Sequence, residues 1–518
     1  MIPLVWVTIL FVAAVVYVRR VYSRFEEYGV KVIRPIPLLG NMAPVLLRRS
    51  HFTGDIHNLY KAFPEEKFAG RFEFLTPMVM IRDLDLVKKI AVKDFEYFLN
   101  HRSVFVESDS FLSRNLIALQ GQEWKDMRST LSPAFTSSKI RHMVPFMVEV
   151  GDQMMATIKK DIKDSGVDYI DIECRDLTSR YANDVIASCA FGLKVNSHVD
   201  VDNKFYDVGK KVTYFGFRAL IITFTMLYLP KLSKMSDVNS NKFFKDLVLG
   251  TMKDRDARNI VRPDMIHLLM EAKKGKLSHE SVKSNDDSTG FATVEESDVV
   301  WTDTDLISQA VLFFIAGFDT VSTAMSFLMY ELAINPEVQE KLAQEIKEHN
   351  IKNGGKFDLQ SIQDMPYLDM VVTELLRLWP PAMLLDRQCS KDYNLGRPNK
   401  YSLKDYIVHK GSSVIIPVVG FHRDPQYFPN PDKFDPERFS EENKHKILPF
   451  SYMPFGLGPR NCIGSRFALC EVKVMAYQIL QHMELSPCEK TCIPAELSKK
   501  SFNVQLKGGH WIRFKART

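Results

Sequence analysis

The chain has 518 residues, 46% of them hydrophobic, and its 68 lysines and arginines against 63 aspartates and glutamates give a net charge of +5. This is the balance of a globular protein with one very large domain or several average ones, and it argues against nucleic-acid binding because no long basic run is present. The cysteines are few and scattered, with no second close pair to complete a zinc site, so we expect reduced thiols in a cytosol-facing protein. They are Cys174, Cys189, Cys389, Cys462, Cys470, Cys488 and Cys492.

The first predicted element is an apolar helix over residues 2–18, IPLVWVTILFVAAVVYV, which arginines follow. Its 17 residues reach the lower limit for spanning a bilayer. A cleaved signal peptide would carry its positive charge before the apolar run, and a buried core helix is a further alternative. Charge after the run favours a signal anchor with its arginines in the cytoplasm. We therefore expect a transmembrane anchor over 1–20, a basic, proline-containing hinge over 21–41, and the body of the protein over 42–518.

The body is expected to be mainly α with minor β, as one large helical domain with short sheets. Apolar residues recur every three or four positions in several segments, which predicts helices there. Extended segments collect near the C-terminal end, where residues 412–420 read as a strand and 501–514 as a hairpin. The helical segments are 151–162, 336–349 and 366–379.

Trp124 and Arg128 are four residues apart in QEWKDMRSTLSPAF and so share one face of a predicted helix. An indole N–H and a guanidinium aimed the same way can hold an anionic group, with bidentate geometry from the arginine. The alternative is a tryptophan packed beneath a surface arginine.

Residues 302–335 form one long helical run that ends before Pro336, and a helix of this length must cross the core. Gly317, Asp319 and Thr320 stand in its middle among apolar residues. An acid beside a hydroxyl is costly in such a place unless it has partners or water. A mid-helix threonine near a glycine also loosens the hydrogen-bond ladder, so a simple kink with Asp319 facing solvent is the alternative.

Glu374 and Arg377 are three residues apart in VVTELLRLWPP and can pair on one helix face. Arg438 lies in the proline-bounded loop FDPERF and could join the same carboxylate. The spacing alone is common on exposed helices.

The stretch PFGLGPRNCIGSRF surrounds Cys462 with glycines and an arginine, and it fits Phe-x-x-Gly-x-Arg-x-Cys-x-Gly without a mismatch. Together with the four motifs described above, in the same order, it resembles the microsomal cytochromes P-450 along essentially the whole chain. Among these it is most similar to the insect enzymes that clear plant toxins and insecticides. The resemblance implies a haem-thiolate catalytic domain over 42–518, which takes electrons from NADPH through a separate flavoprotein reductase, with cytochrome b5 as a further partner.

The family likeness also implies roles for the motif residues. Cys462 would be the axial thiolate of haem b, and Glu374, Arg377 and Arg438 would form a structural network. Asp319 and Thr320 would deliver the protons that dioxygen reduction consumes. The haem contacts would come from Trp124, Arg128, Arg387, Phe455, Gly456, Arg460 and Gly464.

The resemblance further implies a lipophilic small-molecule substrate and an endoplasmic reticulum membrane protein whose catalytic domain faces the cytosol. Two alternatives differ in chemistry or substrate: a haem-thiolate isomerase or dehydratase, and a monooxygenase of endogenous hormones or lipids. A haem sensor or carrier would not need the acid and alcohol at Asp319 and Thr320. The expected walls of the substrate pocket, each with core packing as its alternative, are Phe105, Phe111, Phe313, Phe314, Ala316, Met383 and Leu384.

Overall fold

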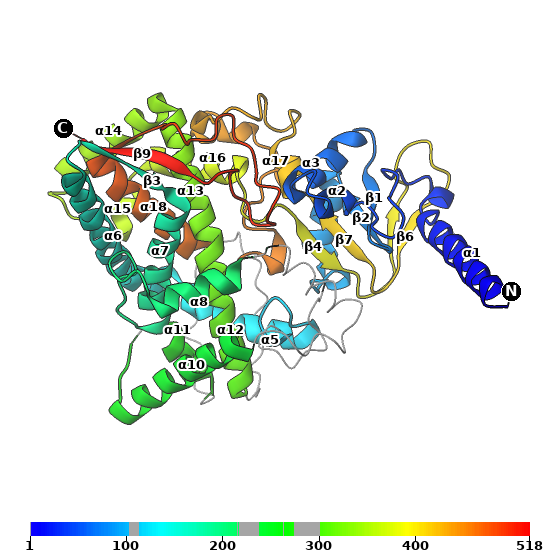
Figure 1. Ribbon diagram of the computed structural model, residues 1–518, viewed down its shortest axis with the longest axis horizontal. Helices are drawn as coiled ribbons and strands as arrows, with labels where there is room; N and C mark the ends of the chain where they lie inside the picture. Colours follow the sequence, from blue (N-terminus) through cyan, green and yellow to red (C-terminus); the bar gives the residue numbers. More distant parts are fainter. Residues whose placement is uncertain are drawn as a thin grey trace. The chain divides into compact units, whose positions relative to one another are not determined.

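The computed structural model of the chain (Figure 1) describes residues 2–102, 113–214, 216, 238–262, 264–273 and 301–517. The chain divides into two compact units. The first unit comprises Met1–Arg102, Ala382–Pro429 and Leu448–Asn461, and the second comprises Ser103–Pro381, Asn430–Ile447 and Cys462–Thr518.

The first unit is built on a four-stranded sheet in the order β1-β2-β7-β4, in which β2 and β7 run parallel and the other pairs antiparallel. All four residues of β7 are buried, as is typical of a central strand rich in β-branched residues. The strands are β1 (Phe68–Glu73), β2 (Thr76–Ile81), β4 (Leu385–Gln388) and β7 (Ser413–Ile416), with β5 (Tyr393–Gly396) and β6 (Tyr406–Val408) as a separate antiparallel pair. The helices are α1 (Ile2–Tyr22), η1 (Glu26–Tyr28), α2 (Ala43–Leu46), α3 (Phe52–Ala62), α4 (Leu84–Lys88), η2 (Lys89–Lys93), η3 (Phe95–Tyr97), α17 (Val418–His422) and η11 (Gly458–Arg460).

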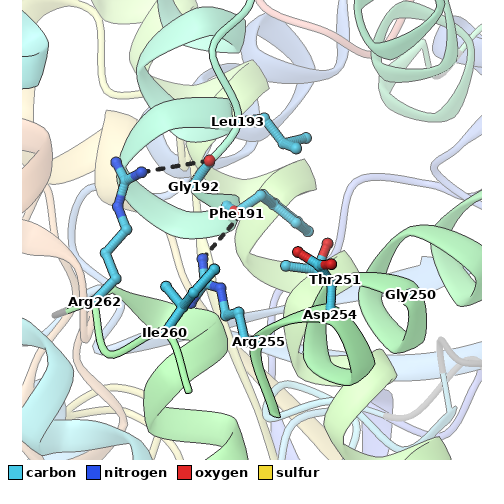
Figure 2. A pocket seen from close by; sticks show the side chains of 9 residues that line it. All are labelled: Phe191, Gly192, Leu193, Gly250, Thr251, Asp254, Arg255, Ile260 and Arg262. Carbon is cyan, nitrogen blue, oxygen red and sulfur yellow. Dashed lines mark hydrogen bonds between the residues drawn. The ribbon is translucent and has the colours of Figure 1, made fainter. Parts of the chain in front are cut away.

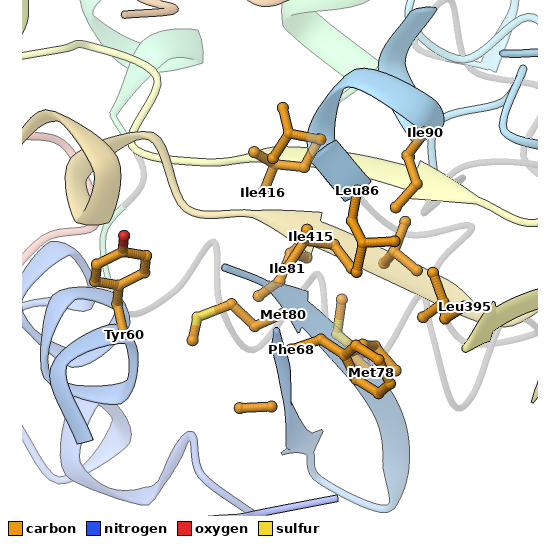
Figure 3. Close-up of a cluster of buried hydrophobic side chains, with 14 of the residues drawn as sticks. Tyr60, Phe68, Met78, Met80, Ile81, Leu86, Ile90, Leu395, Ile415 and Ile416 are labelled. Carbon is orange, nitrogen blue, oxygen red and sulfur yellow. The ribbon is translucent and has the colours of Figure 1, made fainter. Parts of the chain in front are cut away.

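The core of the first unit lies on this sheet, where Phe68, Met80 and Ile415 pack from three strands and Tyr60 packs from α3 (Figure 3). The chain that follows α1 also contributes to this core. The rings of Tyr22 and Phe25 lie 4.9 and 5.2 Å from the ring of Phe72. The end of α1 is therefore fixed to the first unit by aromatic packing.

The second unit is mainly helical and carries one antiparallel sheet in the order β3-β9-β8. Its strands are β3 (Tyr169–Glu173), β8 (Met483–Ser486) and β9 (Trp511–Ala516). Its described helices are α5 (Gly121–Leu131), η5 (Ser132–Phe135), α6 (Ser137–Ser165), α7 (Cys174–Ile186), η6 (Ala187–Phe191), α8 (Lys204–Thr213), α10 (Val238–Arg258), α11 (Met265–Lys273), α12 (Asp303–Ala316), η8 (Gly317–Val321), α13 (Ser322–Ile334), α14 (Pro336–Lys352), α15 (Leu359–Gln363), α16 (Pro366–Leu378), η9 (Pro436–Phe439), η10 (Lys444–Lys446) and α18 (Ser465–His482).

The long run predicted over 302–335 is confirmed as α12, η8 and α13 in succession (Figure 1). It starts with a capping box, in which the side chains of Thr302 and Asp305 each accept a hydrogen bond from the other residue's backbone N–H. Two helices in the described residues are long and apolar enough to cross a membrane, namely α1 and this run. In its most apolar 18-residue window the run is 72% buried, so it is a core helix, whereas the corresponding window near the N-terminus is 0% buried.

The predicted fold class, mainly α with minor β, is confirmed, and the three predicted helices correspond to parts of α6, α14 and α16. The strand expected over 412–420 is shorter, because β7 ends at Ile416 and α17 follows Pro417. The hairpin expected over 501–514 is wrong. Its second half is β9, which pairs with β3 and β8, while Leu506 makes only an isolated bridge to Leu497.

Candidate active site

Cys462 lies two residues before Gly464, the N-cap of α18, so its sulfur is close to the positive end of a helix dipole. The side chain is exposed to solvent, while protein surrounds it on most sides. This burial raises the pKa of the thiol, and the backbone N–H of Gly464 and the charge of Arg128 act in the opposite direction. The local structure thus provides two groups that stabilise a thiolate at an accessible sulfur.

Trp124 and Arg128 both lie on α5 and are both buried, with 4% and 8% of their surfaces exposed. The alternative of a tryptophan beneath a surface arginine is therefore wrong. Burial lowers the pKa of Arg128 to about 10, and the nearby Cys462 opposes that shift. A buried cation on the same unit as the exposed thiol suits an anionic group of a bound cofactor.

Asp319 and Thr320 lie in η8, a π-helical turn between α12 and α13. π-Turns inside α-helices are frequently found at functional sites. Thr320 is exposed, and its hydroxyl donates a hydrogen bond to the carbonyl of Ala316 at 2.6 Å. Gly317 begins the turn, where a Cβ atom would lie 2.4 Å from Cδ1 of Ile186. A larger residue at this position would therefore force the Ile186 side chain to move away from the turn.

Asp319 does not face solvent as an isolated charge. Its carboxylate forms an ion pair with Arg175 of α7, and the two side chains are 23% and 16% exposed. Arg175 also donates to the hydroxyl of Thr323, at 2.5 Å. Sequence reasoning did not identify Arg175, because the pair is separated by 144 positions and no local motif marks it.

Glu374, Arg377 and Arg438 form the network that their spacing suggested. Glu374 and Arg377 are fully buried, and Nε and Nη2 of Arg377 lie 2.7 and 2.8 Å from the carboxylate oxygens. Nε of Arg438 lies 3.3 Å from Oε1 of Glu374, and the backbone N–H of Asp435 donates to the same oxygen at 2.8 Å. One buried carboxylate thus fastens α16 to the η9 loop.

In the first unit, Arg387 lies on β4 with 1% of its surface exposed. Its Nη1 donates to the carbonyl of Asp386 at 2.7 Å, and its buried Nε has no hydrogen-bond acceptor within the described residues. Burial lowers the pKa of Arg387, and the charge of Asp386 opposes the shift. Arg460 is also buried, and its Nε donates to the carbonyl of Leu99 at 2.8 Å.

One glycine of the cysteine motif, Gly458, is required by the backbone conformation of the loop before Cys462. Gly458 has a φ of +67°, and a Cβ atom there would lie 1.8 Å from the carbonyl oxygen of Ala91. Gly456 also has a positive φ, and Phe455 beside it is half-buried. Gly458 is thus required by backbone geometry and by the close approach of η2.

The expected pocket walls differ in their surroundings. Phe314 is fully buried among the rings of Phe205 and Phe244, at 4.8 and 5.1 Å, which favours the core-packing alternative for this residue. Phe313 is half-buried against Phe135 at 5.3 Å. The other described candidates, Ala316, Met383 and Leu384, are half-buried, whereas Phe105 and Phe111 lie outside the described residues.

A separate pocket of about 440 Å³ lies in the second unit and contains none of the predicted site residues (Figure 2). Two arginines reach into it toward the carbonyl oxygens of Phe191 and Gly192. Arg255 binds both carboxylate oxygens of Asp264, at 2.6 and 2.7 Å, and Arg262 approaches the same carboxylate at 3.4 Å. These arginines are already paired and connect α10 to η6. No group of three His, Cys, Asp or Glu side chains suited to a metal ion occurs in the described ranges.

The chain is similar to one known protein family along almost its whole length. The family model "Cytochrome P450" matches residues 31–512. "Cytochrome P450 9e2" of Blattella germanica is 43% identical over 511 residues, which cover 95% of this chain and 94% of that protein. "Probable cytochrome P450 9f2" of Drosophila melanogaster is 42% identical, with 95% of both chains covered. "Cytochrome P450 6k1" of Blattella germanica is 36% identical over 99% of this chain and 96% of that protein.

Proposed function

This chain belongs to the cytochrome P450 family, and on that premise we propose that it oxidises lipophilic foreign compounds such as plant toxins and insecticides. Membership makes it a haem-thiolate monooxygenase that receives its electrons from a reductase. The likeness to insect members supports a role in clearing foreign compounds. It does not favour the isomerase or dehydratase alternative.

The described residues fit a haem group. Cys462 offers one accessible sulfur for the iron, with Gly464 and Arg128 favouring its anionic form. Haem propionates need buried cationic donors, and Arg387 has a buried Nε that lacks an acceptor in the described structure. We assign the propionate contacts to Trp124, Arg128, Arg387 and Arg460. Phe455, Gly456 and Gly464 would then shape the loop around the thiolate.

The haem supplies oxygen activation and the oxidising chemistry when it is bound. The protein must deliver protons to that reaction and keep bulk water out. A threonine hydroxyl has one donor and two acceptor positions, so Thr320 can hold an ordered water while it donates to Ala316. Asp319 would pass protons from solvent to that water, as a positioned acid and base.

The observation that carries this proposal is the π-helical turn that exposes Thr320 beside a partly buried Asp319. An isomerase or dehydratase acting on an already oxidised substrate does not consume protons from such a relay. A monooxygenase does, because dioxygen reduction takes up protons.

The test has two parts. The reduced protein treated with carbon monoxide should show the red-shifted Soret band of thiolate-ligated haem, and a panel of lipophilic compounds should be oxidised only with NADPH and reductase. Thr320→Ala should then release more peroxide per NADPH, because the water that delivers the protons is no longer held in position. Thr320→Ser keeps the hydroxyl and should restore coupling. Equal coupling in all three proteins would remove Thr320 from the mechanism.

We also propose that α1 anchors the protein in the endoplasmic reticulum membrane, with residues 42–518 on the cytosolic side. Arg19 and Arg20 in the last turn of α1, and Arg24 just after it, support this orientation, because positive charge stays on the cytoplasmic side. Cytochrome b5 would be a second electron donor. A membrane location suits substrates that partition into lipid.

A further inference from the structure

Asn503 belongs to the segment that connects β8 to β9, and it is 9% exposed. Its side-chain Nδ2 donates two hydrogen bonds, to Oδ1 of Asp319 at 3.1 Å and to the carbonyl oxygen of Thr213 at 3.0 Å. Asn503 thereby joins the carboxylate in η8 to the last residue of α8. No sequence motif marked this residue, which is 184 positions away from Asp319.

The orientation of the Asn503 amide is set by its neighbours. A carboxylate and a carbonyl oxygen can only accept, so the NH2 group must face Asp319 and Thr213. The amide oxygen, Oδ1, faces a donor instead, because the hydroxyl of Ser501 donates a hydrogen bond to it at 2.9 Å. The backbone N–H of Asn503 in turn donates to that hydroxyl at 3.0 Å. Ser501 is held by an isolated bridge to Gly216.

The two partners of Asp319 both act on one oxygen. Arg175 and Asn503 each approach Oδ1, whereas Oδ2 has no hydrogen bond in the described part of the chain. An oxygen that already accepts from a guanidinium and an amide is the weaker base of the two, since both donors stabilise its negative charge. A proton arriving at this carboxylate should therefore bind at Oδ2.

We propose that Asn503 is a positioning residue for proton delivery, which holds Asp319 by Oδ1 so that Oδ2 carries the proton. This inference rests on the relay of Asp319 and Thr320 proposed above. Arg175 pairs with the carboxylate at the same oxygen, and Asn503 fixes the rotation of the carboxylate. Neither residue exchanges the proton, which enters at Oδ2 from solvent and leaves from Oδ2 toward the water held by Thr320.

The first test measures coupling in the full chain with its haem and reductase. Asn503→Leu has nearly the same shape and no donor, and Asn503→Gln keeps the amide. Loss of a hydrogen bond to a charged group should slow proton delivery by about tenfold. Asn503→Leu should therefore raise peroxide release per NADPH and increase the solvent isotope effect of D2O on product formation. Asn503→Gln should recover part of the loss, and substrate affinity should stay within about twofold in both variants.

The second test does not depend on activity. Thermal midpoints are measured for Asn503→Leu, Asp319→Asn and the double variant. If the two side chains bind each other, the loss in the double variant should be smaller than the sum of the two single losses, since each residue also has a partner of its own. Additive losses would contradict the contact.

The outcomes separate the two proposals. If Asp319→Asn uncouples the enzyme and Asn503→Leu does not, the role of Asn503 is wrong while the relay stands. If neither Asp319→Asn nor Thr320→Ala changes coupling, the relay itself is wrong. Should Asn503→Leu bind little haem, Asn503→Ser and Asn503→Gln carry the comparison. Equal coupling in these two variants and the parent would then reject the role of Asn503.

Discussion

Cys462 is set apart from the other six cysteines by its exposure next to the start of α18. Replacement of its sulfur by imidazole removes the thiolate but leaves a possible iron ligand. Cys462→His should therefore lose the red-shifted Soret band of the reduced, carbon-monoxide-treated protein and show the band of a histidine-ligated haem. Cys492→Ser, at a half-buried cysteine in the same unit, should leave the spectrum unchanged. A retained red-shifted band in Cys462→His would refute the assignment of the axial ligand.

The burial of His510 predicts that acid destabilises the fold. The residue is almost fully buried, and burial, with the charge of Arg175 nearby, lowers its pKa to about 3. Its Nε2 accepts a hydrogen bond from the N–H of Leu506 at 3.0 Å, which protonation of that nitrogen would break. The folded chain therefore keeps His510 neutral, whereas the unfolded chain binds a proton below a pH of about 6.5. Stability is unaffected above that pH and falls as the pH decreases toward 3.

The size of this effect follows from proton linkage. On acidification from pH 7 to pH 5, the neutral His510 should lower the free energy of unfolding by about 2 kcal/mol. Denaturant unfolding of the parent and of His510→Gln at both pH values isolates this contribution, since glutamine can accept the Leu506 bond and does not titrate. The loss of stability on acidification should be smaller by that amount in the variant. Equal losses would mean that His510 is protonated in the folded protein.

At the scale of elements, Glu374 connects α16 to the η9 loop through two arginines and one backbone N–H. Glu374→Ala would leave Arg377 buried without its counter-ion, at a cost of about 3–5 kcal/mol. We expect misassembled protein with little haem, measured as haem per chain after purification. Normal haem content with low activity would instead mean that Glu374 serves the reaction.

An exposed ion pair that ends on the same loop provides the matched control. Lys341 of α14 and Glu437 of η9 pair at the surface, with about half of each side chain exposed. Exposed pairs contribute about 0–1 kcal/mol. Lys341→Ala should therefore retain its haem, and a similar loss in both variants would indicate general fragility of the loop.

The same elements show how far sequence reasoning reaches. Apolar periodicity predicted α14 and α16 because each buries one continuous face, and Pro336 and Pro366 mark their first residues. Pairs three or four residues apart, such as Glu374 with Arg377, also follow from helix geometry. The hairpin predicted over residues 501–514 was wrong, because β9 pairs with strands that are distant in the sequence. The loosened ladder at Gly317 and Thr320 was expected, but no local pattern specified its π-helical form or the close packing of Ile186 from α7 on Gly317.

The site residues also divide into those that a local motif predicts and those that depend on contacts between remote segments. The position of Cys462 in its loop follows from a short motif, whereas the contacts of Asp319 with Arg175 and Asn503 come from remote segments. No local pattern distinguishes these two residues from other polar residues of the chain. The buried position of Phe314 likewise depends on Phe205 and Phe244, which lie on other helices.

At the scale of the whole molecule, the question is where the proposed membrane anchor ends and the folded body begins. α1 has 21 residues and is about 31 Å long, close to the thickness of a bilayer core. Val21 and Tyr22 at its end already pack against the core of the first unit, and Phe25 is 1% exposed within it. The boundary between the two functions therefore lies near Val18, inside α1.

Two truncations test this boundary. Deletion of residues 2–18 removes the apolar run and leaves Tyr22 and Phe25 in place, so the protein should fold, bind haem and be released from membranes by alkaline carbonate, unlike the full chain. Deletion of residues 2–25 also removes the ring of Phe25 from its contact with Phe72. Loss of one core phenylalanine costs about 3–5 kcal/mol, so this variant should melt at a lower temperature and contain less haem. Equal melting temperatures would place the boundary after Phe25, and membrane retention of the shorter deletion would contradict a single anchor.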